Sequence, residues 1–429
     1  MIALAISLLI DTSLAKVNDL VPKDLIPNNS KVLLFSINSS ICLFLQFLLI
    51  KFVITSLLTR RLNSTPKIRA LHIISLTSFF VLVAFVVTLT FQMFYYQIYY
   101  RPICNLIIGV SYGTAAVFLI WLAYLFFIWY KSSRDFIILL YFISMALIGF
   151  NIIFTAVYFE TKLNFTQELV GTYVGGSGDP TAGLFPDLTL VYNISDLIAF
   201  VSLWTTTGIL MKSYRDKSIR SVAYWIILIM PLGFFLTTYF YDYFVSPLLI
   251  SYFHKDPISL SVYETGYLSL GKPIGGLLFA IAFWNMSKLV GYERNMKISI
   301  VIAGWGIFFV FSANQAITQI VSPYPPFGIS SVTIMNVASY LLVLGIFNSA
   351  TLVSANNDLR TSIHKHATKL LRPIGRAEME REIEKAVTKI SEEKEVANIS
   401  DEVPFEFDEN ELKDYLKEVI STKKAHASQ

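Results

Sequence analysis

Asp196 is the residue of this chain that most clearly requires a chemical explanation. It lies eight residues after Leu188 inside an apolar stretch, which places it roughly 12 Å deep if the stretch is a helix that rises 1.5 Å per residue. An ionised carboxylate in hydrocarbon costs roughly 2.5 to 3.5 kcal/mol on insertion scales. Lys272, near the start of a later apolar stretch, is the best partner, so the two residues predict a buried ion pair.

Amide side chains are predicted at a similar depth in other apolar stretches. Asn193 precedes Asp196 by one helical turn and is expected on the same face. The remaining members of this predicted polar tier are Asn38, Asn314, Gln315 and Asn336. Together they indicate an outward-facing site for a small molecule or an ion. A second interpretation is that they only hold helices together, because such bonds contribute about 0.6 to 2 kcal/mol each inside a membrane.

The sequence contains no signature of catalysis or metal binding. No apolar stretch holds a His-x-x-x-His motif, a Gly-x-Ser-x-Gly motif or a pair of carboxylates, the arrangements used by metal, nucleophilic and acid–base catalysis. The two cysteines, Cys42 and Cys104, are too few for a disulfide framework or a zinc site. We expect two buried thiols and no cofactor or metal, and rank an intramembrane enzyme third among the functional hypotheses.

The elements that must position these residues are apolar stretches of about twenty residues, long enough to cross a bilayer as helices. Hydrophobic residues make up 55% of the chain and charged residues only 15%, against about a quarter charged in soluble proteins. We therefore predict an all-α, polytopic transmembrane helical bundle of about nine spans. The predicted spans are residues 32–57, 71–94, 103–130, 136–159, 188–211, 221–245, 268–290, 298–320 and 330–353.

Basic residues are concentrated in every second link between these spans. They are Arg60, Arg61, Lys67, Arg69, Lys131, Arg134, Lys212, Arg215, Lys217, Arg220, Lys288, Arg294 and Lys297. Because cytoplasmic loops carry the excess of Lys and Arg, we predict a multi-pass protein of the cell membrane, with its N-terminus outside and its C-terminus in the cytoplasm. Topology accounts for the positive charge, so no nucleic-acid partner is expected.

Three regions follow from this organisation. Residues 1–31 form a signal-like or interfacial N-terminal segment, and the sequence leaves open whether residues 1–15 are cleaved. Residues 32–354 form the transmembrane domain, in which Pro231 is expected inside a helix and residues 246–260 form a re-entrant or interfacial stretch. Residues 355–429 form a cytoplasmic, amphipathic helical tail.

The tail is predicted to contain two amphipathic helices. The first covers residues 376–396, and a second begins after Asp408, whose side chain would cap it. The apolar stripe of the first helix consists of Met379, Ile383, Val387 and Ile390. Neither helix has enough apolar surface to be stable alone. We therefore predict that residues 376–422 bind the cytoplasmic loops, a second copy of the chain or a cytoplasmic protein.

Two pairs of glycines spaced four residues apart, Gly109 with Gly113 and Gly271 with Gly275, predict places where helices approach closely.

Several segments carry a resemblance to a known family. They are Tyr267, residues 271–276 (GKPIGG), Phe283 with Trp284, residues 322–328 (SPYPPFG) and residues 375–383 (GRAEMEREI). On these residues the chain resembles a family of archaeal multi-spanning membrane proteins of unknown function, mainly between Tyr267 and Ile383. The resemblance implies a location in the cell membrane and a shared tail, and it supplies no activity, substrate or site.

The leading functional hypothesis is a non-enzymatic sensor or scaffold with an outward-facing polar site and a tail that binds partners. The alternative is a secondary transporter or permease that uses Asp196 and Lys272, supported by prolines within the predicted helices. Against the transporter, the sequence shows no internal repeat that relates two halves of the chain.

Overall fold

The computed structural model describes residues 1–20, 28–57, 66–169, 186–212, 221–240, 245–252, 257–290, 294–316, 325–355 and 370–397. Within these ranges the regular structure is helical and contains no strand, which confirms the predicted all-α bundle. The helices are α1 (Ile2–Leu20), α2 (Asn28–Leu57), α3 (Pro66–Tyr96), α4 (Arg101–Ser133), α5 (Phe136–Leu169), α6 (Pro186–Lys212), α8 (Ser221–Tyr239), α10 (Ser246–Tyr252), α11 (Pro257–Leu289), α12 (Arg294–Ala316), α13 (Ile329–Ala355) and α15 (Leu371–Ala397).

Membrane insertion follows from the length and composition of these helices. Among the described residues, seven helices are long and apolar enough to cross a membrane, namely α2, α3, α4, α5, α6, α12 and α13. The other two predicted spans are also helices. Of these, α8 is short and has Pro231 inside it, whereas α11 begins at Pro257, earlier than predicted. The stretch expected to be re-entrant or interfacial therefore divides into α10 and the beginning of α11.

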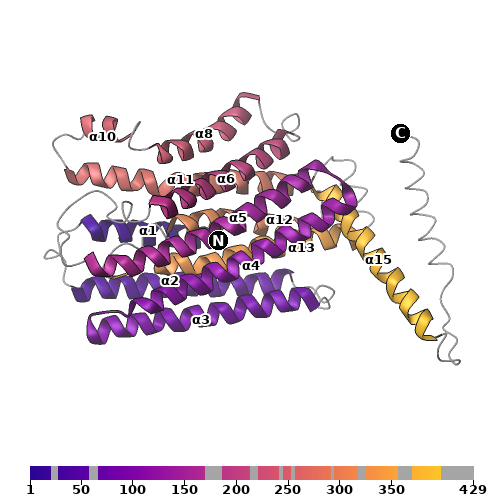
Figure 1. Cartoon of the computed structure of the whole chain (residues 1–429), viewed down its shortest axis with the longest axis horizontal. Coiled ribbons are helices and arrows are strands. Elements are labelled where there is room, and N and C mark those ends of the chain that lie inside the picture. The colour runs from indigo at the N-terminus through magenta and orange to yellow at the C-terminus, as the bar shows by residue number, and fades with distance from the viewer. Residues whose placement is uncertain are drawn as a thin grey trace. The chain divides into compact units, whose positions relative to one another are not determined.

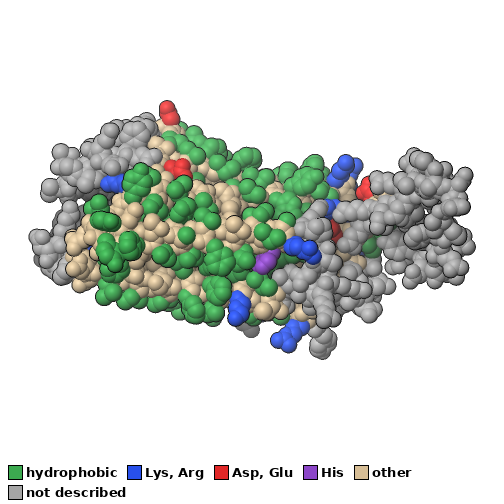
Figure 2. All heavy atoms as spheres, turned by 90° about the horizontal axis from the view of Figure 1, so that it is seen from below, with side chains coloured by type: hydrophobic (Ala, Val, Ile, Leu, Met, Phe, Trp, Pro, Cys, Tyr) green, Lys and Arg blue, Asp and Glu red, His purple; other side chains and the backbone are tan. Residues whose placement is uncertain are grey.

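Neighbouring long helices run alongside one another (Figure 1), and those that follow each other in sequence pack together, as α4 does with α5 and α12 with α13. Gln97, just past the end of α3, donates a hydrogen bond to Asn29 at the start of α2 (3.2 Å). We call this end of the bundle, predicted to face outside, the outer end, and the opposite end the inner end. Figure 2 shows many hydrophobic side chains on the surface of the helical body, as expected where lipid is the solvent.

Helix α13 is the central element of the bundle. It contacts α1, α2, α3, α4 and α12, and its apolar segment is entirely buried. Ser, Thr and Asn side chains are nevertheless frequent along it, and many are completely buried, such as Ser330, Thr333 and Asn336. Some of these hydroxyl groups donate to backbone oxygens of α13 itself, as Thr333 does to Ser330 (2.6 Å). Because lipid does not reach this helix, the remaining polar groups need partners on neighbouring helices or in water.

Helix α1 packs into the bundle against α2, α11, α12 and α13. Leu4 and Leu8 are buried, and so is the carboxylate of Asp11. A helix lying at the outer interface would not bury a carboxylate in this way. The N-terminal segment therefore contributes core contacts that the sequence did not lead us to expect.

Contacts divide the chain into two compact units, Met1–Met379 and Glu380–Gln429. The beginning of α15 belongs to the first unit and packs against the inner end of the bundle. The indole Nε1 of Trp129, on α4, donates a 2.8 Å hydrogen bond to the buried carboxylate of Glu378. A Cβ added at Gly375 would lie 2.0 Å from Cγ1 of Val353, so the backbone of α15 touches the last turns of α13.

The first predicted tail helix is present as α15, which covers residues 376–396 and starts slightly earlier. The second, expected after Asp408, lies outside the described residues.

The predicted glycine contacts have mixed outcomes. A Cβ at Gly275 would lie 2.1 Å from the ring of Phe200, so α6 and α11 approach closely as expected. A Cβ at Gly113 would meet nothing within 4 Å, so the prediction is wrong for that residue. An unpredicted close contact joins α12 to α13, where a Cβ at Gly306 would lie 2.5 Å from the backbone nitrogen of Leu342.

Candidate functional site

The ion pair expected between Asp196 and Lys272 is present in the structure. Lys272 Nζ, on α11, lies 3.1 Å from Asp196 Oδ1, on α6, and both side chains are buried. Tyr192 lies one turn before Asp196, accepts a 3.1 Å hydrogen bond from the same Nζ and places its ring 5.3 Å from it. These three residues form the ion-pair cluster. The ammonium is thus held by a carboxylate, a phenol oxygen and an aromatic face, which together offset its desolvation.

Aromatic rings surround the ion-pair cluster. Tyr192 stacks on Tyr158 of α5, with ring centroids 4.8 Å apart. One turn beyond Asp196, Phe200 stacks on Phe235 of α8 and also contacts Phe279 of α11. Phe200 lies further toward the inner end of α6 than Asp196 does, so apolar rings separate the pair from the inner side.

A chain of hydrogen bonds extends from the α6 segment of this site to α12. The side-chain amide of Asn151, on α5, donates to Ser195 Oγ (3.1 Å), and its own oxygen accepts a bond from Nδ2 of Asn314 (3.2 Å). Asn314 is buried, and its Oδ1 has no partner in the structure. Asn314 thus lies near the ion-pair cluster as predicted, but Asn151, which makes the connection, was not predicted.

The predicted tier has two further members in this region, Gln315 next to Asn314 and Asn193 close to Asp196 in the sequence. Gln315 is buried beside Asn314 on α12. Asn193 is exposed, so its expected position on the same face as Asp196 is wrong. Three residues of a helix advance by about 300° around its axis, roughly 60° short of a full turn. Asn193 therefore does not lie directly above Asp196, and its side chain is turned away from the packed face. Tyr192, four residues before Asp196, takes the interior position instead.

Asn38 belongs to a second polar cluster, built around Asp11. Asn38 Nδ2 donates to Asp11 Oδ1 (2.7 Å), while the backbone N–H and the hydroxyl of Ser331 donate to Oδ2 at 3.0 and 2.7 Å. Ser331 lies in the first turn of α13, where backbone N–H groups have no helical partner. The carboxylate of α1 therefore caps α13 and is stabilised by the positive end of its dipole.

Asn336 lies further along α13, away from the ion-pair cluster. Its Nδ2 donates to the backbone oxygen of Ser75, on α3 (3.2 Å), and its Oδ1 has no partner. The predicted tier is therefore divided between a cluster on α5, α6, α11 and α12 and another on α1, α2, α3 and α13. A similar predicted depth was therefore not enough to place all of its members in one cluster.

The residues that were missed had recognisable signals. Asp11 is an acidic residue in an otherwise apolar segment, which is atypical of a signal peptide. Asn151 is an isolated amide in the middle of a predicted span, where polar groups need partners.

The described residues contain no group of three or more His, Cys, Asp or Glu side chains that could hold a metal ion. Cys42 and Cys104 are free and buried, as expected. Comparison of this chain with protein-family models, curated proteins and solved structures finds no match. The function is therefore inferred from the geometry of the site.

Proposed function

We propose that this membrane protein is a non-enzymatic sensor or scaffold, which holds a small polar or charged ligand near its outer end and presents its tail to cytoplasmic partners. The observation that carries the proposal is the path of α13. Its first turn binds Asp11 through Ser331, and its last turns touch α15 at the contact between Val353 and Gly375. Small shifts of a helix are an established way to transmit a signal across a packed bundle.

The tail is the proposed output. Val387, in the predicted apolar stripe of α15, is exposed, so this helix has an apolar surface that a partner or a second copy could cover. The proposal also includes three predictions from the sequence. The protein is located in the cell membrane, its N-terminus and its polar site face outside, and it belongs to the archaeal family that it resembles.

The test is recovery of partners by chemical cross-linking in cells. Deletion of residues 376–429 should remove the partners or the second copy that cross-links to the full chain. Val387→Glu should have the same effect without shortening the chain, because it places a charge on the apolar stripe. Thr388→Glu, at an exposed position beside it, is the matched control. Identical cross-linking profiles for all these chains would overturn the proposal.

A transporter is the second candidate, favoured by the buried ion pair between Asp196 and Lys272 and the aromatic rings that separate it from the inner side. A transporter that uses this carboxylate should give transient currents in proteoliposomes with one member of a panel of amino acids, organic acids and amines. Asp196→Asn should abolish that current while the chain stays folded. No current from any compound with the wild-type chain would exclude this candidate for the compounds tested.

A further inference from the structure

A ladder of buried polar groups runs along α13 where it faces α2 and α3. At its outer end, Ser39 and Ser330 share a hydrogen bond between their hydroxyl groups (2.6 Å), beside the cap that Asp11 forms. Further along, Gln46 Nε2 donates to Thr333 Oγ1 (2.8 Å). All of these side chains are almost completely buried. We call this series of side chains, from Ser39 and Ser330 at its outer end to His72 at its inner end, the α2–α3–α13 seam.

The inner half of the seam continues on the same face of α13. Asn336, one turn after Thr333, bonds to the backbone of Ser75. Tyr340, one turn further, has its hydroxyl 3.2 Å from Nδ1 of His72, on α3. From Ser330 to Tyr340 the seam covers roughly 15 Å along α13, at 1.5 Å per residue.

The middle of the seam contains unsatisfied hydrogen-bonding groups. Gln46 Oε1, Ser75 Oγ and Asn336 Oδ1 have no partner, and these residues are exposed by only 0%, 1% and 0%. A buried polar group without a partner costs roughly 1 to 3 kcal/mol. The three groups come from three different helices, and their residues are connected to one another only in part: Gln46 bonds to Thr333, and Asn336 bonds to the backbone of Ser75. The Asn336 amide makes no side-chain hydrogen bond to Thr333 or Tyr340, so direct side-chain hydrogen bonds along the described seam are interrupted there. Buried water molecules typically occupy such places and make about three hydrogen bonds each.

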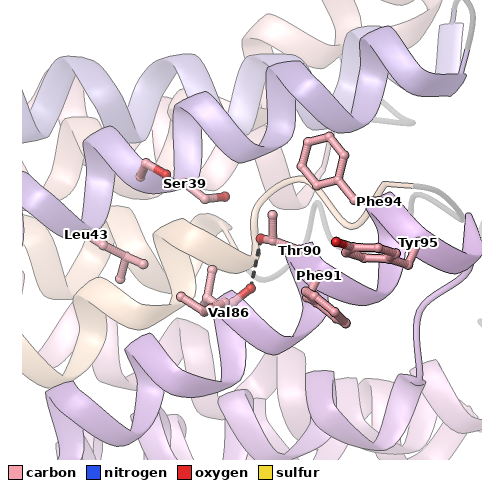
Figure 3. A pocket seen from close by; sticks show the side chains of 9 residues that line it. Ser39, Leu43, Val86, Thr90, Phe91, Phe94 and Tyr95 are labelled. Carbon is pink, nitrogen blue, oxygen red and sulfur yellow. Dashed lines mark hydrogen bonds between the residues drawn. The ribbon is translucent and has the colours of Figure 1, made fainter.

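Each end of the seam lies close to the surface of the bundle, the outer end beside a cavity and the inner end at a partly exposed side chain. At the outer end, Ser39 lines a cavity of about 290 Å³ between α2 and α3. Figure 3 shows Thr90, Phe91, Phe94 and Tyr95 of α3 around this cavity, on the outer half of that helix. At the inner end, His72 is partly exposed near the beginning of α3.

We propose that the α2–α3–α13 seam holds a file of water molecules that connects Asp11 with His72 and serves as a route for protons across the bundle. This goes beyond the proposed sensor or scaffold function and does not depend on it. Waters bridge the amide, hydroxyl and backbone groups in the middle, while the hydroxyls of Ser39, Ser330, Thr333 and Tyr340 accept and donate hydrogen bonds toward the ends. The carboxylate and the imidazole are the titratable groups that exchange protons at the two ends.

The waters can be tested in the wild-type chain by hydroxyl-radical footprinting with X-rays, which modifies side chains next to bound water. Cys42, which donates to Ser330, and Tyr340 belong to the seam. Cys104 and Tyr112 are equally buried elsewhere and serve as matched controls. We expect several-fold faster modification of Cys42 and Tyr340 than of the controls. Equal rates within each pair would overturn the water file.

Proton passage is tested in proteoliposomes that contain the full chain, with pyranine inside and a potassium diffusion potential set by valinomycin. The wild-type chain should acidify or alkalinise the lumen faster than protein-free vesicles. Asn336→Leu should reduce the rate to that of protein-free vesicles. Asn348→Leu is the matched control, because Asn348 is also buried on α13 and has an unpartnered oxygen, but bonds to Ser299 of α12. A wild-type rate equal to that of protein-free vesicles, or equal losses in both variants, would overturn the proton route.

Discussion

Asp196 and Asp11 are both carboxylates within apolar helices, yet their environments stabilise them in different ways. Asp196 lies 3.1 Å from the ammonium of Lys272, so its charge is balanced by an ion. Asp11 accepts hydrogen bonds from the first turn of α13 and from Asn38, so its charge is balanced by dipoles. Replacing each residue should therefore affect stability through a different partner.

Asp196→Ala should lower the free energy of unfolding by about 3 to 5 kcal/mol, because it leaves Lys272 buried without its counter-ion. Combining Asp196→Leu with Lys272→Met should restore stability to near the wild-type level, since two apolar side chains of similar volume need no pairing. Thermal and denaturant unfolding in detergent measure both effects. Asn193→Ala, at an exposed position on the same helix, is the control and should change stability by less than about 0.5 kcal/mol. A double variant as unstable as Asp196→Ala would contradict this account.

Asp11→Ala should destabilise the chain by about 1 to 3 kcal/mol, because Ser331 and Asn38 lose a buried acceptor. Asp11→Asn keeps one acceptor oxygen and should lose less. A suitable comparison is Asp135→Ala, since Asp135 caps α5 through the N–H of Ile137 (2.9 Å) but is only partly buried. Unfolding in detergent should rank Asp11→Ala as the most damaging of the three. Equal losses for Asp11→Ala and Asp11→Asn would argue against the cap.

At the scale of elements, α13 and α15 determine how the bundle meets the tail. The apolar segment of α13 is surrounded by other helices, and its last turns contact the beginning of α15. Glu378 anchors the same part of α15 through the indole of Trp129. The first turns of α15 thus attach the tail to the bundle, whereas Glu380–Gln429 belongs to a separate unit.

Gly375→Ala should detach the first turns of α15, because the new Cβ would lie 2.0 Å from Val353 Cγ1. Trypsin should then cleave faster after the exposed side chain of Arg376. The second substitution Val353→Ala should partly reverse the effect by removing the clashing methyl group.

Gly113→Ala provides the control for this experiment, because nothing lies within 4 Å of a Cβ at that position. It should leave trypsin cleavage unchanged. If Gly375→Ala is also cleaved at the wild-type rate, the contact between α13 and α15 is too loose to transmit a shift.

At the scale of the whole molecule, apolar helices establish that the chain inserts in a membrane, and the loop charges predict its orientation. The inner ends of helices carry basic residues in the structure, such as Lys131 in the last turn of α4, Lys212 in that of α6 and Lys288 in that of α11. By the positive-inside rule, this end is predicted to face the cytoplasm.

Orientation can be measured with single cysteines in a chain that carries Cys42→Ala and Cys104→Ala. In intact cells, a membrane-impermeant maleimide should label Gln97→Cys, at an exposed position of the outer end. It should not label Lys131→Cys, which is exposed at the inner end, until the cells are permeabilised. The reverse pattern would show that the chain inserts with the opposite orientation.

The amino-acid sequence alone predicted most of the helices and their membrane character, and it predicted a similar depth for their polar residues. Apolar length and the rise per residue are properties of a single helix, and depth was enough to pair Asp196 with Lys272. The direction of a side chain around its helix axis, and the identity of the neighbouring helix, depend on packing between distant segments. Only the tertiary structure therefore showed that Asn193 lies on the exposed surface of α6.

The same dependence on packing explains the remaining differences. Asn38 finds its partner, Asp11, in a segment that the sequence suggested was a signal peptide or a surface helix. Asn336 bonds to α3 and belongs to a different cluster from Asp196. Which helices enclose α13, and which of its polar groups remain unsatisfied, are results of long-range packing that no local pattern in the sequence encodes.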